Sequence, residues 1–275
     1  MVQAISFIKA GYCMQIEKLV NPKSGKWRKI PFPSSVAVIE HKTEGVLLFD
    51  TGYTPRMKDI TRHFPERLYA LVTPITVEKE DTAIYQLNQR GISEKDVKHV
   101  VLSHFHADHV AGVLDYPSAK LVFSKKEYRE MMSHPSLLQL RHAFLPALLP
   151  HGMESRNQAY GIKTPLSALG KDWTGYDYFD DGSLFVVPLP GHSVGHLGLY
   201  LPDVKGKEYF LIGDAAWLRS SFLENVVPAA FAQHLVFSDP AEYAKTLGKL
   251  HQLRSDIAIV PCHCHETLKG LETHV

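Results

Sequence analysis

The sequence predicts an α/β protein in which buried strands alternate with amphipathic helices. Short apolar runs rich in β-branched residues, such as residues 97–104 (VKHVVLSH), are typical of strands buried on both faces. Residues 239–254 (DPAEYAKTLGKLHQLR) have the periodicity of a helix, with Asp239 as a candidate N-cap and Pro240 at the first helical position. No internal repeat, linker or low-complexity tract interrupts the pattern, so we expect a single domain over residues 1–275.

The strands and helices can be placed in order along the chain. Two strands come first, over residues 34–41 and 44–52, and a helix over residues 78–91 follows them. Further strands are expected over residues 97–104, 120–124, 183–193, 196–202, 207–216 and 256–263, and further helices over residues 125–134 and 239–254. Residues 129–180 are the least regular part, which suggests a lid or a substrate loop.

Composition narrows the class of protein. The hydrophobic fraction is 45% and the charged fraction 21%, as in ordinary soluble proteins, and the formal net charge of +1 gives no strong field for nucleic acid or a membrane surface. The three cysteines, Cys13, Cys262 and Cys264, do not form a disulfide framework. No signal peptide or run of about 20 apolar residues is present. We therefore expect a cytoplasmic protein that acts on a small molecule.

A dense group of polar residues lies in residues 100–112 (VVLSHFHADHVAG). His104, His106, Asp108 and His109 fall within six positions, and without a cation they would repel or desolvate one another. His104 and His106, two apart on an extended turn, can share one cation, and Asp108 and His109 can face a second. Imidazole and carboxylate together suit zinc, although iron, cobalt or manganese would also bind.

More candidate ligands stand at the ends of other predicted strands, where loops usually present chemistry. They are Asp50, His192, Asp214 and His263. Spacing alone does not separate His192 from His196, or His263 from His265, and a lone histidine at such a place is more often structural. Cys262 and Cys264 are interpreted as small core residues rather than thiolate ligands.

These motifs resemble those of the metallo-β-lactamase-fold hydrolase superfamily. The segment SHFHADHVAG is similar to its hallmark motif, and LLFDTG, LPGHSVGH and LIGDA stand in the family's order. The resemblance implies a four-layer αββα sandwich with two metals at one edge of the sheets. It also implies that His104, His106 and His192 hold one metal, that Asp108, His109 and His263 hold the other, and that Asp214 bridges both.

The chemistry of such a centre needs no serine or cysteine nucleophile. Two cations about 3.5–4 Å apart share a water, lower its pKa and polarise a carbonyl or phosphoryl oxygen. A hydroxide that bridges the metals is then the nucleophile. The resemblance gives catalytic roles to Asp214 and to Asp108, which also handles the leaving-group proton.

Within the superfamily the chain is most similar to N-acyl-homoserine lactonases. His109 and Asp214 differ from the arginine and cysteine typical of secreted β-lactamases, and the 12 residues after His263 are too few for the helical domain of glyoxalase II-like thioesterases. We therefore expect a dinuclear zinc hydrolase that opens a lactone or a related ester, and the resemblance implies an N-acyl-homoserine lactonase that acts in quorum quenching. The alternatives are another acyl, thioester or phosphoester hydrolase, or a metal-binding regulator with vestigial activity.

Three aromatic residues are expected at the substrate pocket: Trp217, Phe105 and Phe144. The lactonases commonly place a tyrosine three residues after the bridging aspartate, where this chain has Trp217. An indole N–H can donate a hydrogen bond but cannot act as a phenolic acid. Phe144 and the leucines after it could line an acyl-chain channel, or instead pack a short helix against the core.

Overall fold

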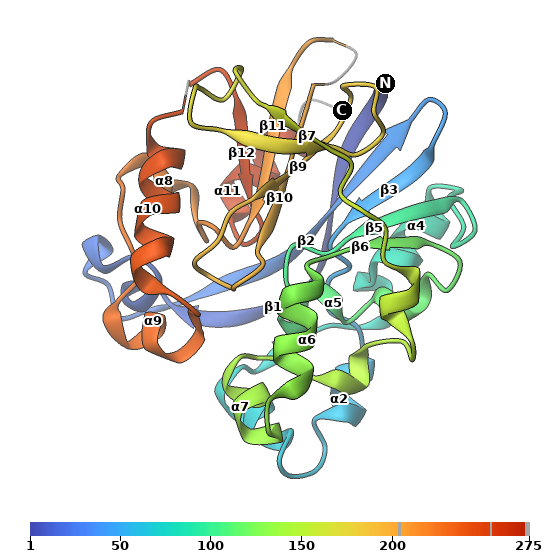
Figure 1. The fold of residues 1–275 in the computed structure, drawn as a ribbon. Helices are drawn as coiled ribbons and strands as arrows, with labels where there is room; N and C mark the ends of the chain where they lie inside the picture. The colour runs from blue at the N-terminus through green and yellow to red at the C-terminus, as the bar shows by residue number, and fades with distance from the viewer. Residues whose placement is uncertain (203–204, 254, 273–275) are drawn as a thin grey trace.

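Two sheets face each other, and helices cover their outer faces, in a computed structural model that describes residues 1–202, 205–253 and 255–272 (Figure 1). The first sheet contains, in spatial order, β4 (Ile75–Thr76), β1 (Val2–Ile16), β2 (Lys29–His41), β3 (Gly45–Phe49), β5 (Val97–Val101) and β6 (Lys120–Val122). The second contains β12 (Ala258–Pro261), β11 (Glu208–Gly213), β10 (Leu197–Pro202), β9 (Phe185–Pro188), β8 (Thr174–Asp177) and β7 (Ile162–Pro165).

Most of the described helices are short, and α10, at 12 residues, is the longest of them. They are α1 (Glu17–Val20), α2 (Arg56–Ile60), α3 (Arg67–Val72), α4 (Ala83–Gln89), α5 (Ala107–Val110), α6 (Lys125–Ser133), α7 (Ser136–Arg141), α8 (Arg219–Leu223), α9 (Ala230–Val236), α10 (Pro240–His251) and α11 (His265–Glu272). Single 3-10 turns lie at η1 (Pro22–Ser24), η2 (Lys79–Asp81), η3 (Val113–Asp115), η4 (Pro146–Leu148) and η5 (Met153–Arg156).

The central strands are apolar on both faces because each face packs against a different layer. Along β2, Val36 and Val38 belong to the cluster that includes Leu87 of α4, whereas Ala37 and Ile39 belong to the cluster between the two sheets. A strand buried on both sides reads as a nearly continuous apolar run, as this one does.

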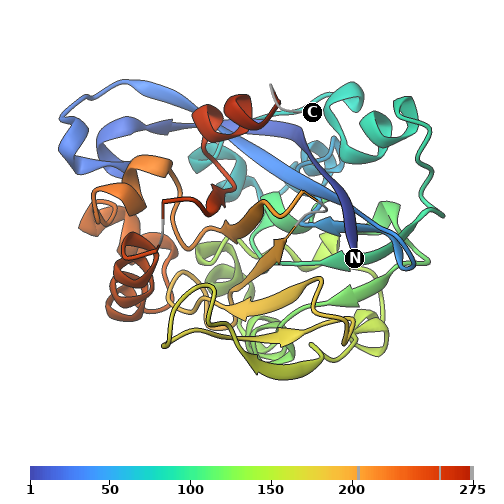
Figure 2. The same ribbon diagram turned by 90° about the horizontal axis from the view of Figure 1, so that it is seen from above.

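The second sheet repeats this arrangement. Leu199 of β10 and Leu211 of β11 point toward the first sheet, whereas Tyr200 and Phe210 pack with Leu247 of α10 on the outside. Seen from above, the blue-to-green strands and the yellow-to-red strands form separate layers (Figure 2). The four-layer αββα sandwich implied by the sequence motifs is therefore confirmed.

Two predicted segments differ in the structure. The helix expected over residues 78–91 starts at Ala83, because the Thr82 side chain accepts a hydrogen bond from the Tyr85 amide and caps it there. The stretch 129–180, expected to be irregular, contains α7 and also β7 and β8, which extend the second sheet. The helix expected over residues 239–254 is α10, capped by Asp239 as predicted, and Arg254 lies outside the described residues.

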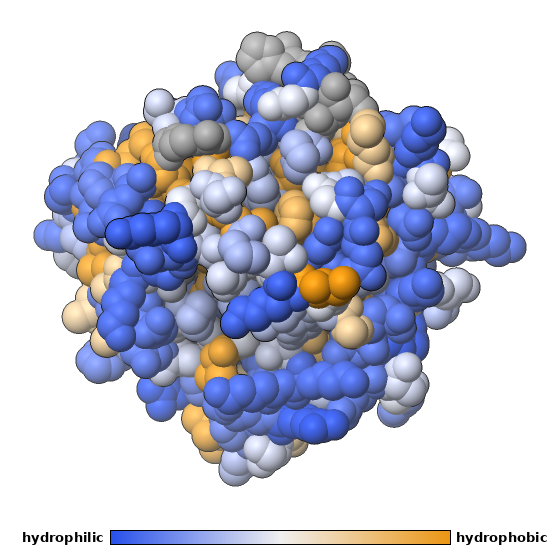
Figure 3. Space-filling view, turned by 45° about the horizontal axis from the view of Figure 1, so that its top comes forward, coloured by the Kyte–Doolittle hydropathy of each residue, from blue (hydrophilic) through white to orange (hydrophobic). Residues whose placement is uncertain are grey.

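The surface is mixed in character. On the face drawn in Figure 3, hydrophobic residues are scattered in small groups among hydrophilic ones, as is usual for a surface in contact with water. Within the described part of the chain, none of the helices is both long enough and apolar enough to cross a lipid bilayer.

Candidate metal centre

Strands of both sheets end at one edge of the sandwich, and the candidate ligands lie in the segments that follow these strand ends. β3 and β5 pair in parallel, so Asp50 and residues 102–106 emerge side by side. β11 and β12 also pair in parallel, which brings Asp214 and His263 together. The loop between the antiparallel strands β9 and β10 adds His192. The topology therefore gathers segments that are far apart in the sequence.

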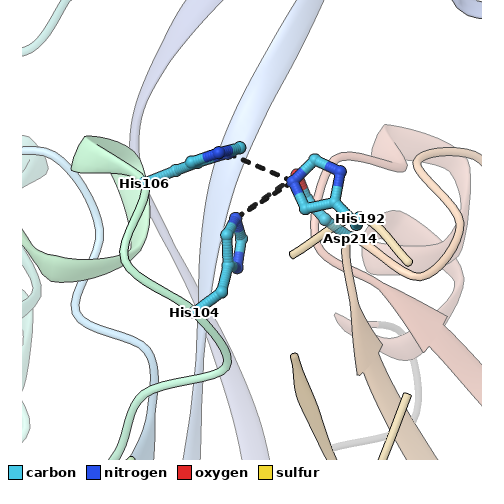
Figure 4. A group of neighbouring side chains, drawn as sticks. All are labelled: His104, His106, His192 and Asp214. Carbon is cyan, nitrogen blue, oxygen red and sulfur yellow. Dashed lines mark hydrogen bonds and ion pairs between the residues drawn. The ribbon is translucent and has the colours of Figure 1, made fainter. Parts of the chain in front are cut away.

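The first group consists of His104, His106, His192 and one oxygen of Asp214 (Figure 4). The Nε2 atom of His192 lies 3.1 Å from His104 Nε2 and 3.1 Å from His106 Nδ1. Oδ2 of Asp214 lies 3.2 Å from the same His192 nitrogen. Nitrogen ligands of a tetrahedral zinc ion, each about 2.1 Å from the metal, lie about 3.4 Å apart, so these spacings suit one ion.

The second group is built around the other oxygen of Asp214. Its Oδ1 atom lies 3.0 Å from His263 Nε2 and 3.4 Å from His109 Nε2. Oδ2 of Asp108 lies 3.5 Å from His263 Nε2 and 3.6 Å from His109 Nε2. Cys262 Sγ is also near, but it is hydrogen-bonded to the Ser35 backbone. The two oxygens of Asp214 thus face two different groups of imidazoles.

A pair of cations fits these residues. His192 Nε2 carries at most one hydrogen, so it can donate a hydrogen bond to only one of the two imidazole nitrogens that lie 3.1 Å from it. Burial, above all, lowers the pKa of His104 and His192 well below the ordinary range and that of His106 to about 3, and neutral imidazole is the form that binds metal. In the second group, His109 Nε2 and Asp214 Oδ1 are buried and have no hydrogen-bond partner among the residues that the structure describes. A metal ion in each group would satisfy these atoms.

The charges around the second group also favour a cation. Burial disfavours a charged His109, yet the carboxylates of Asp108 and Asp50 outweigh it and raise the pKa of His109 well above the ordinary range. Asp214 raises the pKa of His263 in the same way, again against burial. The surrounding carboxylates therefore attract positive charge to this spot.

Several candidate ligands are oriented by partners behind them. His109 Nδ1 lies 2.7 Å from Asp50 Oδ2, and Asp50 in turn accepts hydrogen bonds from the backbone and side chain of Ser103. His263 Nδ1 lies 2.7 Å from the Pro33 carbonyl oxygen. Asp50 adopts a left-handed φ of 64°, which aspartate tolerates better than most residues. Outer partners of this kind fix the tautomer and direction of ligand imidazoles.

The two competing histidines lie outside both groups. His196 is buried, but its Nε2 accepts a hydrogen bond of 3.0 Å from the Asp214 amide. It therefore supports the turn that carries Asp214. His265 is exposed at the start of α11. The geometry thus separates His192 from His196 and His263 from His265, which spacing alone had left open.

Of the three expected pocket residues, Phe105 and Phe144 lie in the core, whereas Trp217 lies beside the candidate site. Phe105 and Phe144 are both 1% exposed and lie in the core beside the first sheet. The ring of Phe105 contacts that of Phe144 and also those of Phe123 and Tyr128. Their burial leaves no face for a substrate, and the leucines after Phe144 pack a short 3-10 turn as in the alternative interpretation. Trp217 is 7% exposed, and its indole N–H donates a 2.9 Å hydrogen bond to Asp214 Oδ2.

Sequence reasoning missed two residues beside the ligands. Ser103 precedes the histidine motif and bonds to Asp50, His104 and His109. Glu127 lies in α6 and contacts two ligand loops. A serine next to a metal motif is a weak signal that could have been used, whereas a glutamate in the first turn of a polar helix has no distinguishing pattern.

Comparison with known proteins identifies the family of this chain. The profile of the metallo-beta-lactamase superfamily matches residues 30–263. The chain therefore belongs to this superfamily. It is 30% identical over 191 residues to a protein of Mycobacterium tuberculosis named as a probable metallo-hydrolase, a match that covers 65% of this chain and 55% of that one. The chain thus spans little more than half the length of this relative.

Lactonases are among the other relatives. The N-acyl homoserine lactonase AiiA of Bacillus thuringiensis subsp. kurstaki is 22% identical over 237 residues, which cover 86% of this chain and 85% of AiiA. A solved structure of an N-acyl homoserine lactone hydrolase, with the product N-hexanoyl-L-homoserine at its catalytic metal centre, has a TM-score of 0.73 and 20% identity. It covers 98% of this chain and 96% of the solved chain, so the fold is shared over its whole length.

Proposed function

We propose that the chain is a dinuclear metal-dependent hydrolase that opens lactones, with N-acyl-homoserine lactones as the expected substrate class. The observation that carries the proposal is Asp214, whose two oxygens face two separate groups of imidazoles. The similarity to lactonases over most of the chain supports the substrate class. Such an activity would destroy lactone signals and so act in quorum quenching.

We assign one zinc ion to each group. His104, His106 and His192 would hold the first, Asp108, His109 and His263 the second, and Asp214 would contact both. Zinc is the proposed metal because imidazole and carboxylate ligands in these numbers suit it. When bound, two such ions activate a water molecule and polarise a carbonyl oxygen, so the chain needs no side-chain nucleophile.

Exposure indicates the side from which a substrate enters. His106 and Asp108 are each 9% exposed, whereas the other five proposed ligands are 3% exposed or less. A substrate must therefore approach beside these two residues. This places the Asp108 carboxylate next to the incoming molecule, where it can carry a proton to the leaving alkoxide oxygen of an opened lactone.

Trp217 has a different proposed role from the tyrosine of the lactonase pattern. Its N–H is already bonded to Asp214, and its ring packs edge-on against Phe32 and Phe237. It therefore holds the Asp214 carboxylate rather than the substrate carbonyl. Activation of that carbonyl is then left to the metals.

The cytoplasm is the proposed compartment. Cys13, Cys262 and Cys264 are all free and buried, as expected of a chain that folds under reducing conditions.

Metal content and substrate range should be measured on the same preparation. We expect two zinc ions per chain and hydrolysis of lactones of varied acyl length in preference to thioesters and phosphodiesters. Removal of metal by a chelator should abolish turnover, and zinc should restore it. Two bound ions without lactone hydrolysis, but with turnover of a thioester or phosphodiester, would move the chain to another hydrolase class. Bound metal with no turnover at all would favour a regulator.

A further inference from the structure

A buried carboxylate joins the two loops that carry the first group of histidines. We propose that Glu127 is a positioning residue that holds residues 102–106 and residues 189–196 at the separation needed to bind the first metal. The inference rests on the proposed function, because it concerns the metal sites assigned there. Glu127 forms its hydrogen bonds with two backbone amides and a serine hydroxyl of these loops, and not with the side chains of the proposed ligands. It therefore acts on the ligands only through the loops that carry them.

Three hydrogen bonds converge on this carboxylate. Oε1 accepts one of 3.1 Å from the Phe105 amide, which lies between His104 and His106 in the chain. Oε2 accepts one of 2.8 Å from the Ser193 hydroxyl and one of 3.1 Å from the Gly195 amide, in the loop that carries His192. All three partners donate, so only a group that accepts on both sides satisfies them.

The two loops belong to different sheets. Residues 102–106 follow β5 of the first sheet, and residues 189–196 follow β9 of the second. Glu127 therefore ties the two sheets together beside the metal centre. A backbone hydrogen bond of 2.8 Å, from the Leu197 amide to the Ser103 carbonyl oxygen, also connects the segment after β5 with the start of β10.

The start of α6 packs closely against the loop that carries His192. A Cβ atom added to Gly195 would lie 2.0 Å from Ser124 Oγ and 2.9 Å from Glu127 Oε2. Ser124 caps α6 by accepting a hydrogen bond from the Glu127 amide. The helix start and the histidine loop therefore lie in direct contact, which fixes the position of the carboxylate.

Burial shows that this contact is more than a surface interaction. Glu127 is 2% exposed, and a buried carboxylate is unfavourable unless hydrogen-bond donors surround it. Burial raises the pKa of Glu127 to about 7, and the bonds from Ser193, Phe105 and Gly195 oppose the rise. An apolar residue at this place in α6 would leave the three donors of the two loops without an acceptor, so the carboxylate is explained by the loops that it joins.

The test removes the charge of Glu127 in two single-site backgrounds. His263→Ala leaves the first group intact, and His104→Ala leaves the second. Glu127→Gln keeps the shape, but its amide N–H₂ must face a donor on one side. We expect it to weaken zinc binding at least tenfold in the His263→Ala background and less than threefold in the His104→Ala background. Competition with a chromophoric chelator measures both affinities.

Controls separate positioning from general stability. Glu130→Gln makes the same change one turn further along α6 and should leave both affinities within twofold. Ser193→Ala removes one of the three donors and should weaken zinc binding at the first site, but less than Glu127→Gln does. If the Glu127→Gln variant does not fold, Ser193→Ala provides the test in its place. Equal weakening of both sites, or weakening of neither, would overturn the inference. Wild-type protein that binds no zinc would instead refute the proposed function.

Discussion

The two groups of imidazoles that face Asp214 are oriented by different means. In the second group each ring has a fixed oxygen behind it, Asp50 for His109 and the Pro33 carbonyl for His263, both at 2.7 Å. In the first group, Nδ1 of His192 is buried without a hydrogen-bond partner among the described residues. His104 Nδ1 does lie 2.9 Å from the Ser103 hydroxyl, so it is chiefly His106 and His192 whose rings depend on how their loops are placed.

The two groups therefore illustrate two ways in which a protein can orient the imidazoles of a candidate metal site. A ring held by its own carboxylate keeps its tautomer and direction even if the loop shifts slightly. A ring without such a partner is directed only by packing and by the backbone that carries it. Changes behind the second group should therefore act on single ligands, whereas changes near the first should act on whole loops.

Asp108→Asn should have the largest effect on turnover. Asp108 belongs to the second group and lies at the open side of the site. A proton carrier contributes about 10²–10⁴-fold to rate, so we expect turnover per bound metal to fall by about 10²-fold or more. Turnover and zinc content should be measured together. Activity that falls only in proportion to zinc content would limit Asp108 to metal binding.

Asp50→Asn tests the outer partner of the second group. The amide can still contact His109 but no longer holds its imidazole with a charge, and changes of this kind cost about 10–100-fold in metal affinity or activity. In the His104→Ala background we expect zinc binding to weaken by this amount, and in the His263→Ala background to change little. If both backgrounds weaken alike, the two groups are not independently supported.

Trp217 lies beside the first group, against His192 and Asp214 Oδ2, and its replacement should have a smaller catalytic effect. Trp217→Phe removes the N–H that bonds to Asp214 and should lower turnover by no more than about tenfold, about 1.4 kcal/mol in barrier terms. Trp217→Ala leaves a cavity and should lower the free energy of unfolding by about 3–5 kcal/mol. Kinetics and thermal denaturation measure the two effects. A raised Michaelis constant with unchanged stability would place the indole against the substrate.

His99 offers a buried histidine away from the metal groups for comparison. Burial lowers its pKa to about 4, and its Nδ1 lies 2.8 Å from the Tyr178 hydroxyl. Between about pH 6.5 and pH 4 the unfolded chain binds a proton that the folded chain does not, so stability falls as the pH falls through this range.

His99→Gln should remove that dependence, which amounts to no more than about 2 kcal/mol after allowance for solvent screening. Denaturant unfolding at pH 7 and pH 4.5 measures it on protein with and without the substitution. Zinc affinity at pH 7 should not change. A variant that keeps the full pH dependence would mean that the other buried histidines cause it.

Much of the fold and the candidate site followed from local patterns. The strand at 97–101 and the helix that Asp239 caps were predictable because a doubly buried strand and a capped helix start are both determined by residues that are neighbours in the sequence. The density of His104, His106, Asp108 and His109 predicted a metal site because those side chains, so close together, need a cation.

Only the tertiary structure decided which distant groups meet. Asp214 faces both groups of imidazoles because β11 ends beside β12 and opposite β5, and strand pairing of this range leaves no local signal. Glu127 looks like any surface glutamate until α6 lies against the His192 loop, and Phe144 looks like a pocket residue until the core closes around it. Periodicity shows that a residue is buried, but the packing of segments far apart in the chain determines what it is buried against.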